Sequence, residues 1–455
     1  MRTLVIGLDC AAPDILFGED RLTNLRQLMS RGCYGRIESV IPPITVPAWS
    51  CMMSSRDPGE LGFYGFRNRK DHSYDGYSLA NSLAVREPRV WDYLEKQGLR
   101  SILLGVPQTY PPRHILGEMV TCFLTPSTQT DYTYPAALKE EIERVSGGYI
   151  LDVENFRTDD KQAILDQIFE MTRRRFRVAK HLITRHPWDF FMMVEMGVDR
   201  IHHGFWKYFD REHPKHEPGN PFENAIRDYY RYVDREVGEI VSLLGRDCAV
   251  LVVSDHGAKR MVGGICFNEW LMAKGYLRLK ELPSRPTPFS QVEIDWDHTL
   301  AWGDGGYYGR LFLNVKGREP RGQIEPGDYE TVRARLVAEI QAIEDPAGRN
   351  IGSVALRPEE IYRARGGVPP DLIVYFGNLD WRSVGSVGYR SIYTFDNDTG
   401  PDDANHAQHG IFTLRMPGRT GGRQVSGLRI YDVAPTVLHL FGIPVPEEMQ
   451  GNIIR

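Results

Sequence analysis

A short strand that ends in a carboxylate and an imidazole is predicted by Ala249-Val250-Leu251-Val252-Val253-Ser254-Asp255-His256-Gly257. Its first five residues are all apolar, as in a buried strand. Open α/β sheets bind ligands just beyond the carboxyl ends of their strands, and an aspartate oxygen with a histidine nitrogen suits Zn²⁺ or Mn²⁺. An Asp-His pair at a strand end also commonly forms a turn or a helix cap. The metal hypothesis therefore requires further ligands elsewhere in the chain.

The chain opens with a second apolar run that ends in an acid. Residues 3–8 are followed by Asp9, which would lie at a strand end like Asp255; capping of the next segment is its alternative role. Similar apolar runs recur, and helical patterns at 161–185 and 222–244 lie between them. The predicted strands are 3–8, 101–106, 189–194, 248–253, 310–315 and 371–376. This alternation is typical of an α/β fold with a doubly wound, mostly parallel sheet flanked by helices.

Three further segments carry side chains suited to a functional site. Thr45 lies in a proline-rich loop before a run of small residues, although loop threonines usually bond to nearby backbone. Asp199 and His203 are four residues apart, so on a helical turn they share a face and can hold one ion; a simple side-chain pair is the alternative. His406 and His409 lie in a polar loop before an apolar strand, where either can be solvated.

Taken together and in this order, these residues make the sequence resemble a known family. The chain is identified as a member of the alkaline phosphatase superfamily, and it is most similar to the branch of type I phosphodiesterases and nucleotide pyrophosphatases. The resemblance runs through nearly the whole chain. It comprises Leu4–Asp9, Thr45–Trp49, Arg56–Pro58 with Gly62, Asp199–His203, Ser254–Gly257, Phe267–Leu271, Pro370–Leu372, His406–Ile411 and Asp432–Thr436.

The resemblance implies two divalent metal ions, which we expect to be Zn²⁺ or Mn²⁺. One ion is then held by Asp9, Thr45, Asp255 and His256, and the other by Asp199, His203 and a histidine late in the chain. For this last ligand we favour His406 over His409. In the family the ligand stands four residues before the glycine that opens the next strand, which is Gly410 in this sequence.

The implied activity is hydrolysis of phosphate esters, most closely phosphodiester or nucleotide pyrophosphate bonds. Two ions roughly 4 Å apart suit in-line displacement at phosphorus. Thr45 is implied as the nucleophile, because a coordinated hydroxyl loses its proton much more readily than a free one. The expected intermediate is a phospho-threonine that water then hydrolyses.

The stretch after Thr45 departs from the family pattern. Nucleotide pyrophosphatases carry an asparagine there that helps to bind a phosphate oxygen, and its strict counterpart in this chain is Phe66. Arg67, Asn68 or a backbone N–H group is therefore the expected substrate-binding group. A second departure is Cys10, which stands where glycine usually follows the first aspartate. We expect it to be a small buried residue with no further role.

Other functions are weighed against diester hydrolysis. A phosphomonoesterase or a phosphonate monoester hydrolase is the main alternative, because the groups that receive the second substituent of a diester cannot be located from sequence. A sulfatase needs a Cys-x-Pro-x-Arg frame, and neither Cys10 nor Cys51 has a proline two residues later. A cofactor-independent phosphoglycerate mutase typically uses serine as the nucleophile. A non-catalytic binding protein is disfavoured, since all seven ligand positions hold competent residue types.

Length and charge set the expected organisation and partners. A chain of 455 residues exceeds the ~250–300 residues that one core usually supports. We expect a discontinuous core of residues 1–259 and 310–455, with a cap inserted at 260–309 over the active site and 320–370 as a candidate extension of the cap. The net charge of −5 gives no polyanion-binding signature. The expected partner is thus a small phosphate ester and not nucleic acid.

Two smaller expectations concern arginines and cysteines. The run 173–177 contains four arginines on the predicted helix 161–185, where we expect them to form its solvated face. Six cysteines without any CxxC pair favour reduced, buried thiols in a cytoplasmic protein. The apolar run before Asp9 is too short for a signal-peptide core, and no stretch approaches the ~20 apolar residues of a membrane span.

Overall fold

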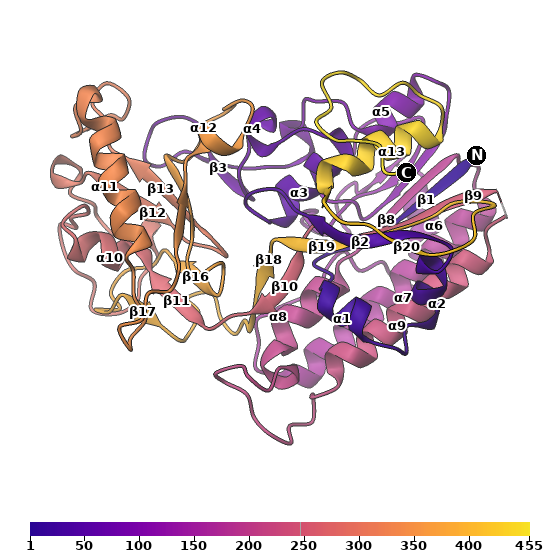
Figure 1. Ribbon diagram of the computed structural model, residues 1–455, viewed down its shortest axis with the longest axis horizontal. Helices are drawn as coiled ribbons and strands as arrows, with labels where there is room; N and C mark the ends of the chain where they lie inside the picture. Colours follow the sequence, from indigo (N-terminus) through magenta and orange to yellow (C-terminus); the bar gives the residue numbers. More distant parts are fainter. Residues whose placement is uncertain (246) are drawn as a thin grey trace.

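The computed structural model describes residues 1–245 and 247–455 as two lobes (Figure 1). The larger lobe surrounds one extended sheet with the strand order β20-β2-β19-β9-β1-β8-β5-β6-β7, and β21 pairs with β2. Its strands are β1 (Arg2–Leu8), β2 (Gly32–Glu38), β5 (Ser101–Leu104), β6 (Gly117–Val120), β7 (Thr133–Tyr134), β8 (Phe190–Glu195), β9 (Cys248–Val253), β19 (His409–Arg415), β20 (Arg423–Gln424) and β21 (Leu428–Arg429). At the centre, β1 runs parallel to both β8 and β9.

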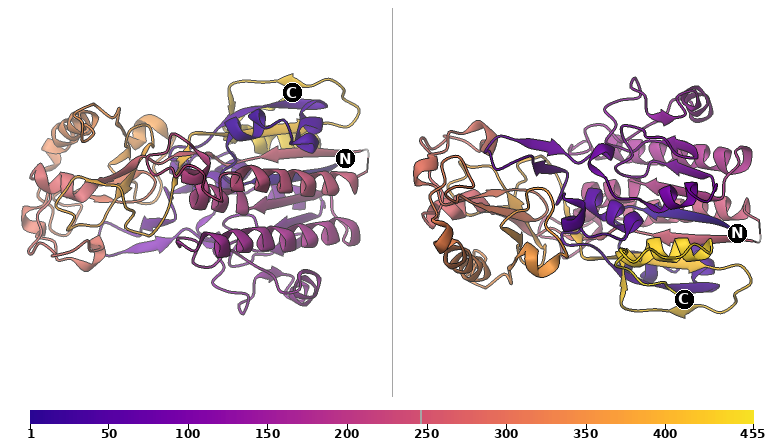
Figure 2. Two further views of the ribbon diagram at one scale, coloured as in Figure 1. Left: turned by 90° about the horizontal axis from the view of Figure 1, so that it is seen from below. Right: turned by 90° about the horizontal axis from the view of Figure 1, so that it is seen from above.

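Helices cover both faces of this sheet. One layer contains α2 (Thr23–Met29), α6 (Leu138–Ser146), α7 (Lys161–Arg185), α8 (Gly197–Phe209) and α9 (Ala225–Ser242), and the other contains α3 (Thr45–Ser54), α5 (Val90–Glu95) and α13 (Val433–Leu440). Figure 2 shows the two long helices α7 and α9 side by side across one face. This arrangement confirms the predicted doubly wound α/β fold class.

The smaller lobe is built from two further sheets with their own hydrophobic core, which includes Phe267, Trp302 and Leu313. The four-stranded sheet contains β12 (Ala301–Asp304), β13 (Gly309–Leu313), β15 (Leu372–Tyr375) and β14 (Val354–Leu356). The three-stranded sheet contains β16 (Trp381–Val384), β11 (Gly263–Cys266) and β17 (Tyr393–Thr394), and the helices are α10 (Phe267–Ala273), α11 (Tyr329–Gln341) and α12 (Pro358–Ile361).

Most of the predicted strands and helices are present, but two of the predicted strands belong to a different sheet from the one expected. The runs 310–315 and 371–376 do form strands, β13 and β15, yet both belong to the antiparallel four-stranded sheet and not to the main sheet. An apolar run identifies a buried strand without identifying its partners. The expected boundary between residues 309 and 310 consequently falls inside the smaller sheet, next to the pairing of β12 with β13.

The arginine run on α7 is also only partly as expected. Arg173 and Arg177 are exposed, whereas Arg175 is only 1 % exposed and lies inside the lobe. Its guanidinium donates to the carbonyl oxygens of Val194 (3.2 Å) and Leu151 (3.0 Å). Val194 lies in the buried strand β8, and Leu151 lies in the segment between α6 and α7. The charge is therefore stabilised by backbone acceptors that the sequence pattern does not reveal.

The remaining helices and strands are short. They are α1 (Pro13–Gly18), α4 (Pro58–Leu61), the hairpin of β3 (Arg67–Arg69) and β4 (Tyr77–Leu79), and the antiparallel pair of β10 (Gly257–Arg260) and β18 (Ala404–Ala407). Among them, β3 carries Arg67 and Asn68, and β18 carries His406. Across the described part of the chain, we find no helix that combines the length and the apolar character needed to cross a bilayer.

Candidate metal centre

The seven residues expected to hold metal ions converge at one edge of the main sheet. Asp9 follows β1, and Asp255 and His256 follow β9, whose register with β1 places the two strand ends side by side. Thr45 is the first residue of α3, and Asp199 and His203 lie on α8, which begins just after β8. His406 comes from β18, where it pairs with Ala258 of β10. All seven side chains are buried.

One group of candidate ligands comprises Asp9, Asp255 and His256, whose ligand atoms all lie within 4.8 Å of one another. His256 Nε2 lies 3.1 Å from Asp255 Oδ2 and 4.0 Å from Asp9 Oδ1. The Thr45 hydroxyl oxygen is 3.3 Å from the same nitrogen. The nucleophile predicted from the sequence therefore lies directly beside this group.

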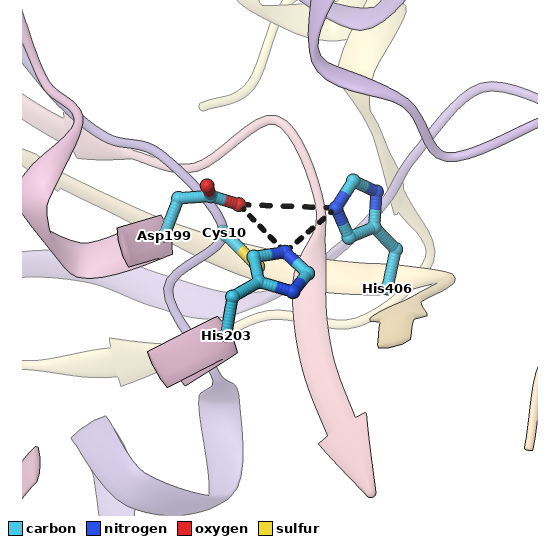
Figure 3. Close-up of side chains that lie close together, drawn as sticks. All are labelled: Cys10, Asp199, His203 and His406. Atoms are coloured by element: carbon cyan, nitrogen blue, oxygen red, sulfur yellow. Dashed lines mark hydrogen bonds and ion pairs between the residues drawn. The ribbon is translucent and has the colours of Figure 1, made fainter. Parts of the chain in front are cut away.

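A second group comprises Asp199, His203, His406 and Cys10 (Figure 3). Asp199 Oδ1 lies 3.2 Å from His203 Nε2 and 3.8 Å from His406 Nε2. The two histidine nitrogens are 3.3 Å apart. Three ligand atoms at such mutual distances can surround a single cation, since Zn²⁺ binds nitrogen and oxygen ligands at about 2.0–2.2 Å.

The tautomer of each candidate histidine is set by a partner on its other ring nitrogen. His203 Nδ1 lies 2.7 Å from Asp402 Oδ1, and His406 Nδ1 lies 2.8 Å from the Pro43 carbonyl oxygen. His256 Nδ1 faces the Gly257 carbonyl at 3.2 Å. When each ring is neutral, a proton on Nδ1 satisfies the acceptor, so the Nε2 lone pair is left to face the cluster, as in metal-binding histidines.

At the candidate site, two buried carboxylate oxygens have no hydrogen-bond partner among the described residues. They are Asp9 Oδ1 and Asp255 Oδ2, and both belong to the first group. Burial raises the pKa of both carboxyls well above the usual range, and the neighbouring carboxylates of Asp199 and Asp9 add to the rise. A buried anionic oxygen without a donor is costly, and a divalent cation satisfies it. The residues present thus fit a metal ion.

The second group has a different electrostatic balance. Burial lowers the pKa of His203, but the carboxylates of Asp402 and Asp199 outweigh it and raise this pKa to about 10. The pKa of Asp199 is lowered despite its burial, because His203 and the adjacent Arg200 stabilise the carboxylate. Arg200 also pairs with Asp152 at 2.6 Å, which holds its guanidinium in place.

Trp49 holds the carboxylate of Asp9 in position. Its indole N–H donates to Asp9 Oδ2 at 2.6 Å. The ring crosses β1 at Gly7, where an added Cβ would lie 2.4 Å from the Trp49 ring. Only glycine allows this close approach, so Gly7 and Trp49 together fix the orientation of the Asp9 carboxylate.

Cys10 has more contacts than the sequence indicates. Its φ of +64° is left-handed, which explains why glycine is usual at this position. The backbone N–H donates to Asp255 Oδ1 at 3.1 Å, and the thiol contacts the Gly257 carbonyl at 3.4 Å. The expectation of a small buried residue is met, but the sulfur also lies in the second group of candidate ligands.

Of the two residues expected to bind substrate, Arg67 lines a cavity beside Thr45 and Asn68 does not. A cavity of about 350 Å³ opens beside Thr45 and is lined by Phe66 and Arg67, among others. Asn68 does not line it: its amide accepts from the Tyr64 N–H and donates to the Gly65 carbonyl. Asn68 therefore stabilises the loop instead of facing the cavity, and this part of the expectation is corrected.

Several residues of the site carry no sequence signal that would have identified them. Asp402 and Tyr307 contact His203 from loops far along the chain, and the Tyr307 hydroxyl donates to Asp402 Oδ2 at 2.9 Å. Arg157 donates to that hydroxyl at 3.1 Å.

Of the two late histidines, His406 is in the cluster, whereas His409 is exposed on β19.

Comparisons with known proteins agree with this geometry. Residues 3–410 match the model of the type I phosphodiesterase / nucleotide pyrophosphatase family. No curated protein sequence matches the chain. The chain belongs to the type I phosphodiesterase / nucleotide pyrophosphatase family, which confirms the resemblance seen in its motifs. It is accordingly a metal-dependent hydrolase of phosphate esters.

Solved structures share the fold over nearly the full length. Human ectonucleotide pyrophosphatase / phosphodiesterase 5 superposes with a TM-score of 0.57 at 13 % identity, covering 100 % of this chain and 97 % of its own. An inactive threonine-to-alanine variant of the murine protein in complex with AMP gives 0.57 at 12 % identity, with 98 % and 96 % covered. Phosphonoacetate hydrolase from Sinorhizobium meliloti 1021 in complex with phosphonoformate gives 0.60 at 16 % identity, with 95 % and 94 % covered.

Proposed function

We propose that this protein hydrolyses phosphodiesters by nucleophilic attack of Thr45 at two divalent metal ions. The observation that carries the proposal is the position of Thr45. Its hydroxyl lies 3.3 Å from His256 Nε2, at the wall of a cavity that also reaches Asp199, His203 and His406. A nucleophile between two groups of candidate ligands is the arrangement that phosphoryl transfer requires.

The ligand assignment follows the two groups. Asp9, Asp255, His256 and the Thr45 oxygen would hold one ion, and Asp199, His203 and His406 the other. The donor set contains carboxylate, imidazole and hydroxyl, which suits Zn²⁺ or Mn²⁺. When bound, such ions supply Lewis-acid stabilisation of the charge that develops on the phosphoryl oxygens and on the attacking and leaving oxygens.

Thr45 is well placed for covalent chemistry. As the first residue of α3, it lies at a helix N-terminus, where N–H groups without intrahelical acceptors favour an anion. Attack forms an Oγ–P bond and breaks the bond from phosphorus to the leaving alcohol, which gains a proton as the Thr45 hydroxyl loses one. Water then cleaves the Oγ–P bond of the phospho-threonine, which still carries the retained alcohol, and a phosphomonoester is released. The inactivity of the murine threonine-to-alanine variant described above supports a threonine nucleophile for this chain.

The second substituent of a diester has a suitable surface in the same cavity. Phe66 and Phe123 provide apolar contact, and Arg67 provides a cation. Phe66 occupies the strict counterpart of the family asparagine, so we propose that Arg67 takes over contact with a phosphate oxygen.

We further propose that the smaller lobe acts as the cap over this site. It supplies Gly305, Gly306, Tyr307, Tyr308 and Arg310 to the catalytic cavity. We also propose a cytoplasmic location, supported by the six cysteines, all of which are buried free thiols. Such thiols persist in a reducing compartment.

The decisive experiment is a substrate panel with metal-reconstituted protein. Bis-p-nitrophenyl phosphate, p-nitrophenyl phosphate, a p-nitrophenyl phosphonate and nucleotide diesters would be compared by kcat/KM. We expect the diesters to be the best substrates. A clear preference for the monoester would assign the site to a phosphomonoesterase, and a preference for the phosphonate would assign it to a phosphonate monoester hydrolase.

A further inference from the structure

A second, larger cavity adjoins the catalytic one. It has a volume of about 1010 Å³ and lies along the smaller lobe, against the β3–β4 hairpin. The two cavities share the lining residues Arg67, Arg157, Tyr307 and Arg310, together with the glycines between β12 and β13. A ligand that enters the catalytic cavity can therefore extend into the larger one without crossing the core. A cavity of this size holds far more than a nitrophenyl group.

Positive charge predominates on the walls of the larger cavity. Six cationic side chains line it against four carboxylates. The cations are Arg67, Arg157, Lys280, Arg310, Arg321 and Arg382, and the carboxylates are Asp75, Glu293, Asp304 and Asp398. Lys280, Arg310 and Arg321 have close carboxylate partners in Glu293, Asp304 and Asp297. The other three, Arg67, Arg157 and Arg382, have longer carboxylate contacts or none among the described residues. Their N–H groups are therefore the donors most available to a ligand in the cavity.

Arg382 is the most informative of these three residues. Its side chain is only 5 % exposed, yet its Nε has no hydrogen-bond partner among the described residues. The two terminal nitrogens reach Thr399 Oγ1 at 3.2 Å and Asp398 Oδ1 at 3.4 Å, both long contacts. The two terminal nitrogens therefore make no short hydrogen bond of their own, and Arg382 lines the cavity. An anion in the cavity could accept from them in a charge-assisted hydrogen bond.

Arg157 and Arg67 lie where the two cavities meet. Arg157 donates to the Tyr307 hydroxyl at 3.1 Å and lies 3.4 Å from Asp402, while its Nη1 makes no hydrogen bond within the described residues. Arg67 is exposed and forms no ion pair within those residues. Both guanidinium groups retain free N–H donors next to the candidate metal centre.

Tyr307 connects the two cavities physically. Its ring centroid lies 4.8 Å from that of His203 and 4.2 Å from that of His406. The Arg382 guanidinium carbon lies 6.0 Å from the centroid of the same ring, on the side of the larger cavity. The ring of Tyr307 therefore lies next to both the candidate ligands and Arg382. A substrate held at Thr45 can extend past this ring to Arg382.

We propose that the larger cavity is a second anion-binding subsite. The substrate would be a phosphodiester whose non-transferred or leaving portion carries a further anionic group, a phosphate or a carboxylate. Arg382 and Arg157 bind this group, and Arg67 guides it past the junction. The connecting portion of the ligand packs on the apolar wall that Phe289 and Trp296 provide. This inference rests on the proposed diesterase function, which it narrows to diesters with a distal anion.

The test uses synthetic p-nitrophenyl diesters that differ only in the distal end of the second alcohol. Alkyl chains of increasing length would end in a phosphate, a carboxylate or a hydroxyl group. For the wild-type protein we expect KM for an anion-tipped diester of suitable length to be about tenfold lower than for its hydroxyl-tipped counterpart. One charge-assisted hydrogen bond can account for a change of this size, since tenfold corresponds to about 1.4 kcal/mol.

Three variants locate the effect. Arg382→Gln should remove the preference for the anionic tip while leaving KM for the hydroxyl-tipped diester unchanged within about twofold, and Arg382→Lys should retain part of the preference. Arg321→Gln is the matched control, because Arg321 lines the same cavity but is paired with Asp297. Thermal melting checks that each variant folds. If Arg382→Gln fails to fold, Arg157→Gln tests the same preference, read as the ratio of KM for the anion-tipped and hydroxyl-tipped diesters, because Arg157 is the other residue proposed to bind the distal anion.

The possible outcomes separate the two proposals. Hydrolysis of all diesters with equal KM values, whatever the tip, would overturn the second subsite and leave the diesterase function intact. Equal loss of preference in Arg321→Gln and Arg382→Gln would also overturn it, because a diffuse field would then account for the effect. Absence of hydrolysis of every diester would overturn the proposed function and this inference with it. A preference for one anionic tip over the hydroxyl tip would support the second subsite and show whether it favours phosphate or carboxylate.

Discussion

His203 Nδ1 and Asp402 Oδ1 lie 2.7 Å apart, with both side chains buried. The carboxylate holds the imidazole so that Nε2 faces Asp199 and His406. Such a partner also makes the ligand nitrogen more basic, and its loss typically lowers metal affinity 10–100-fold. Asp402 is thus a positioning residue for the second group of candidate ligands, although it is absent from every motif of the family resemblance.

Replacement of Asp402 should weaken metal binding selectively. Asp402→Asn keeps a hydrogen-bond acceptor but loses the charge, so we expect metal affinity of the second group to fall about tenfold. Asp402→Ala should lower it further. Equilibrium dialysis with elemental analysis measures both. Asp403→Asn serves as the neighbouring control, since the Asp403 carboxylate does not contact a candidate ligand; an equal loss in this variant would refute the assignment.

Removal of metal should abolish turnover and lower thermal stability. Without a cation, Asp9 Oδ1 and Asp255 Oδ2 remain buried without a donor. Binding of an ion to the folded state alone stabilises it by about 2.7 kcal/mol at a free concentration of ~100 Kd. We expect EDTA to abolish activity and lower Tm, and Zn²⁺ or Mn²⁺ to restore both. Full turnover with a verified absence of metal would contradict this expectation.

Metal binding should release protons and strengthen as pH rises. The pKa of about 10 at His203 means that its imidazole is protonated at neutral pH in the metal-free protein, whereas a ligand must be neutral. The raised pKa of Asp9 and of Asp255 acts in the same direction. Affinity should therefore increase from neutral pH towards about 10 and fall at acidic pH.

Calorimetry in buffers of different protonation enthalpy counts the released protons directly. Asp402→Asn should release fewer protons at neutral pH, because Asp402 is the strongest of the groups that raise the pKa of His203. Metal affinity that does not change with pH over this range would show that His203 is not a ligand.

The sequence predicts the parts of this site that follow strands. Asp9 and Asp255 end apolar runs whose pairing is confirmed, and Asp199 with His203 share one face of α8 as their spacing predicts. His406 is different. Its position depends on the pairing of β18 with β10, which brings a residue about 150 positions away next to His256. Only the family resemblance indicated it.

The unpredicted parts depend on tertiary contacts between distant loops. Tyr307 and Asp402 reach His203 from the smaller lobe and the loop before β18, and neither has a periodic or local signal. β13 has a clear strand pattern, but its sheet is set by partners that no local pattern contains. Local sequence patterns thus predict the strands and helices themselves. Contacts between distant parts of the chain determine which of these elements meet at the site.

The nucleophile is where structural and catalytic effects should separate most clearly. Thr45→Ala removes a hydroxyl and a methyl group at the start of α3, so we expect a loss of at most ~1–2 kcal/mol in the free energy of unfolding. Turnover should fall by several orders of magnitude, because the covalent route is closed while substrate binding persists. Thr45→Ser should keep more activity, since a primary hydroxyl can occupy the same position 3.3 Å from His256 Nε2. Melting temperature, metal content and turnover would be measured for all three proteins, with acid quench and mass spectrometry to trap phospho-threonine. If Thr45→Ala folds, binds metal and turns over at the wild-type rate, Thr45 is not the nucleophile, and Ser50 on the same helix becomes the next residue to test.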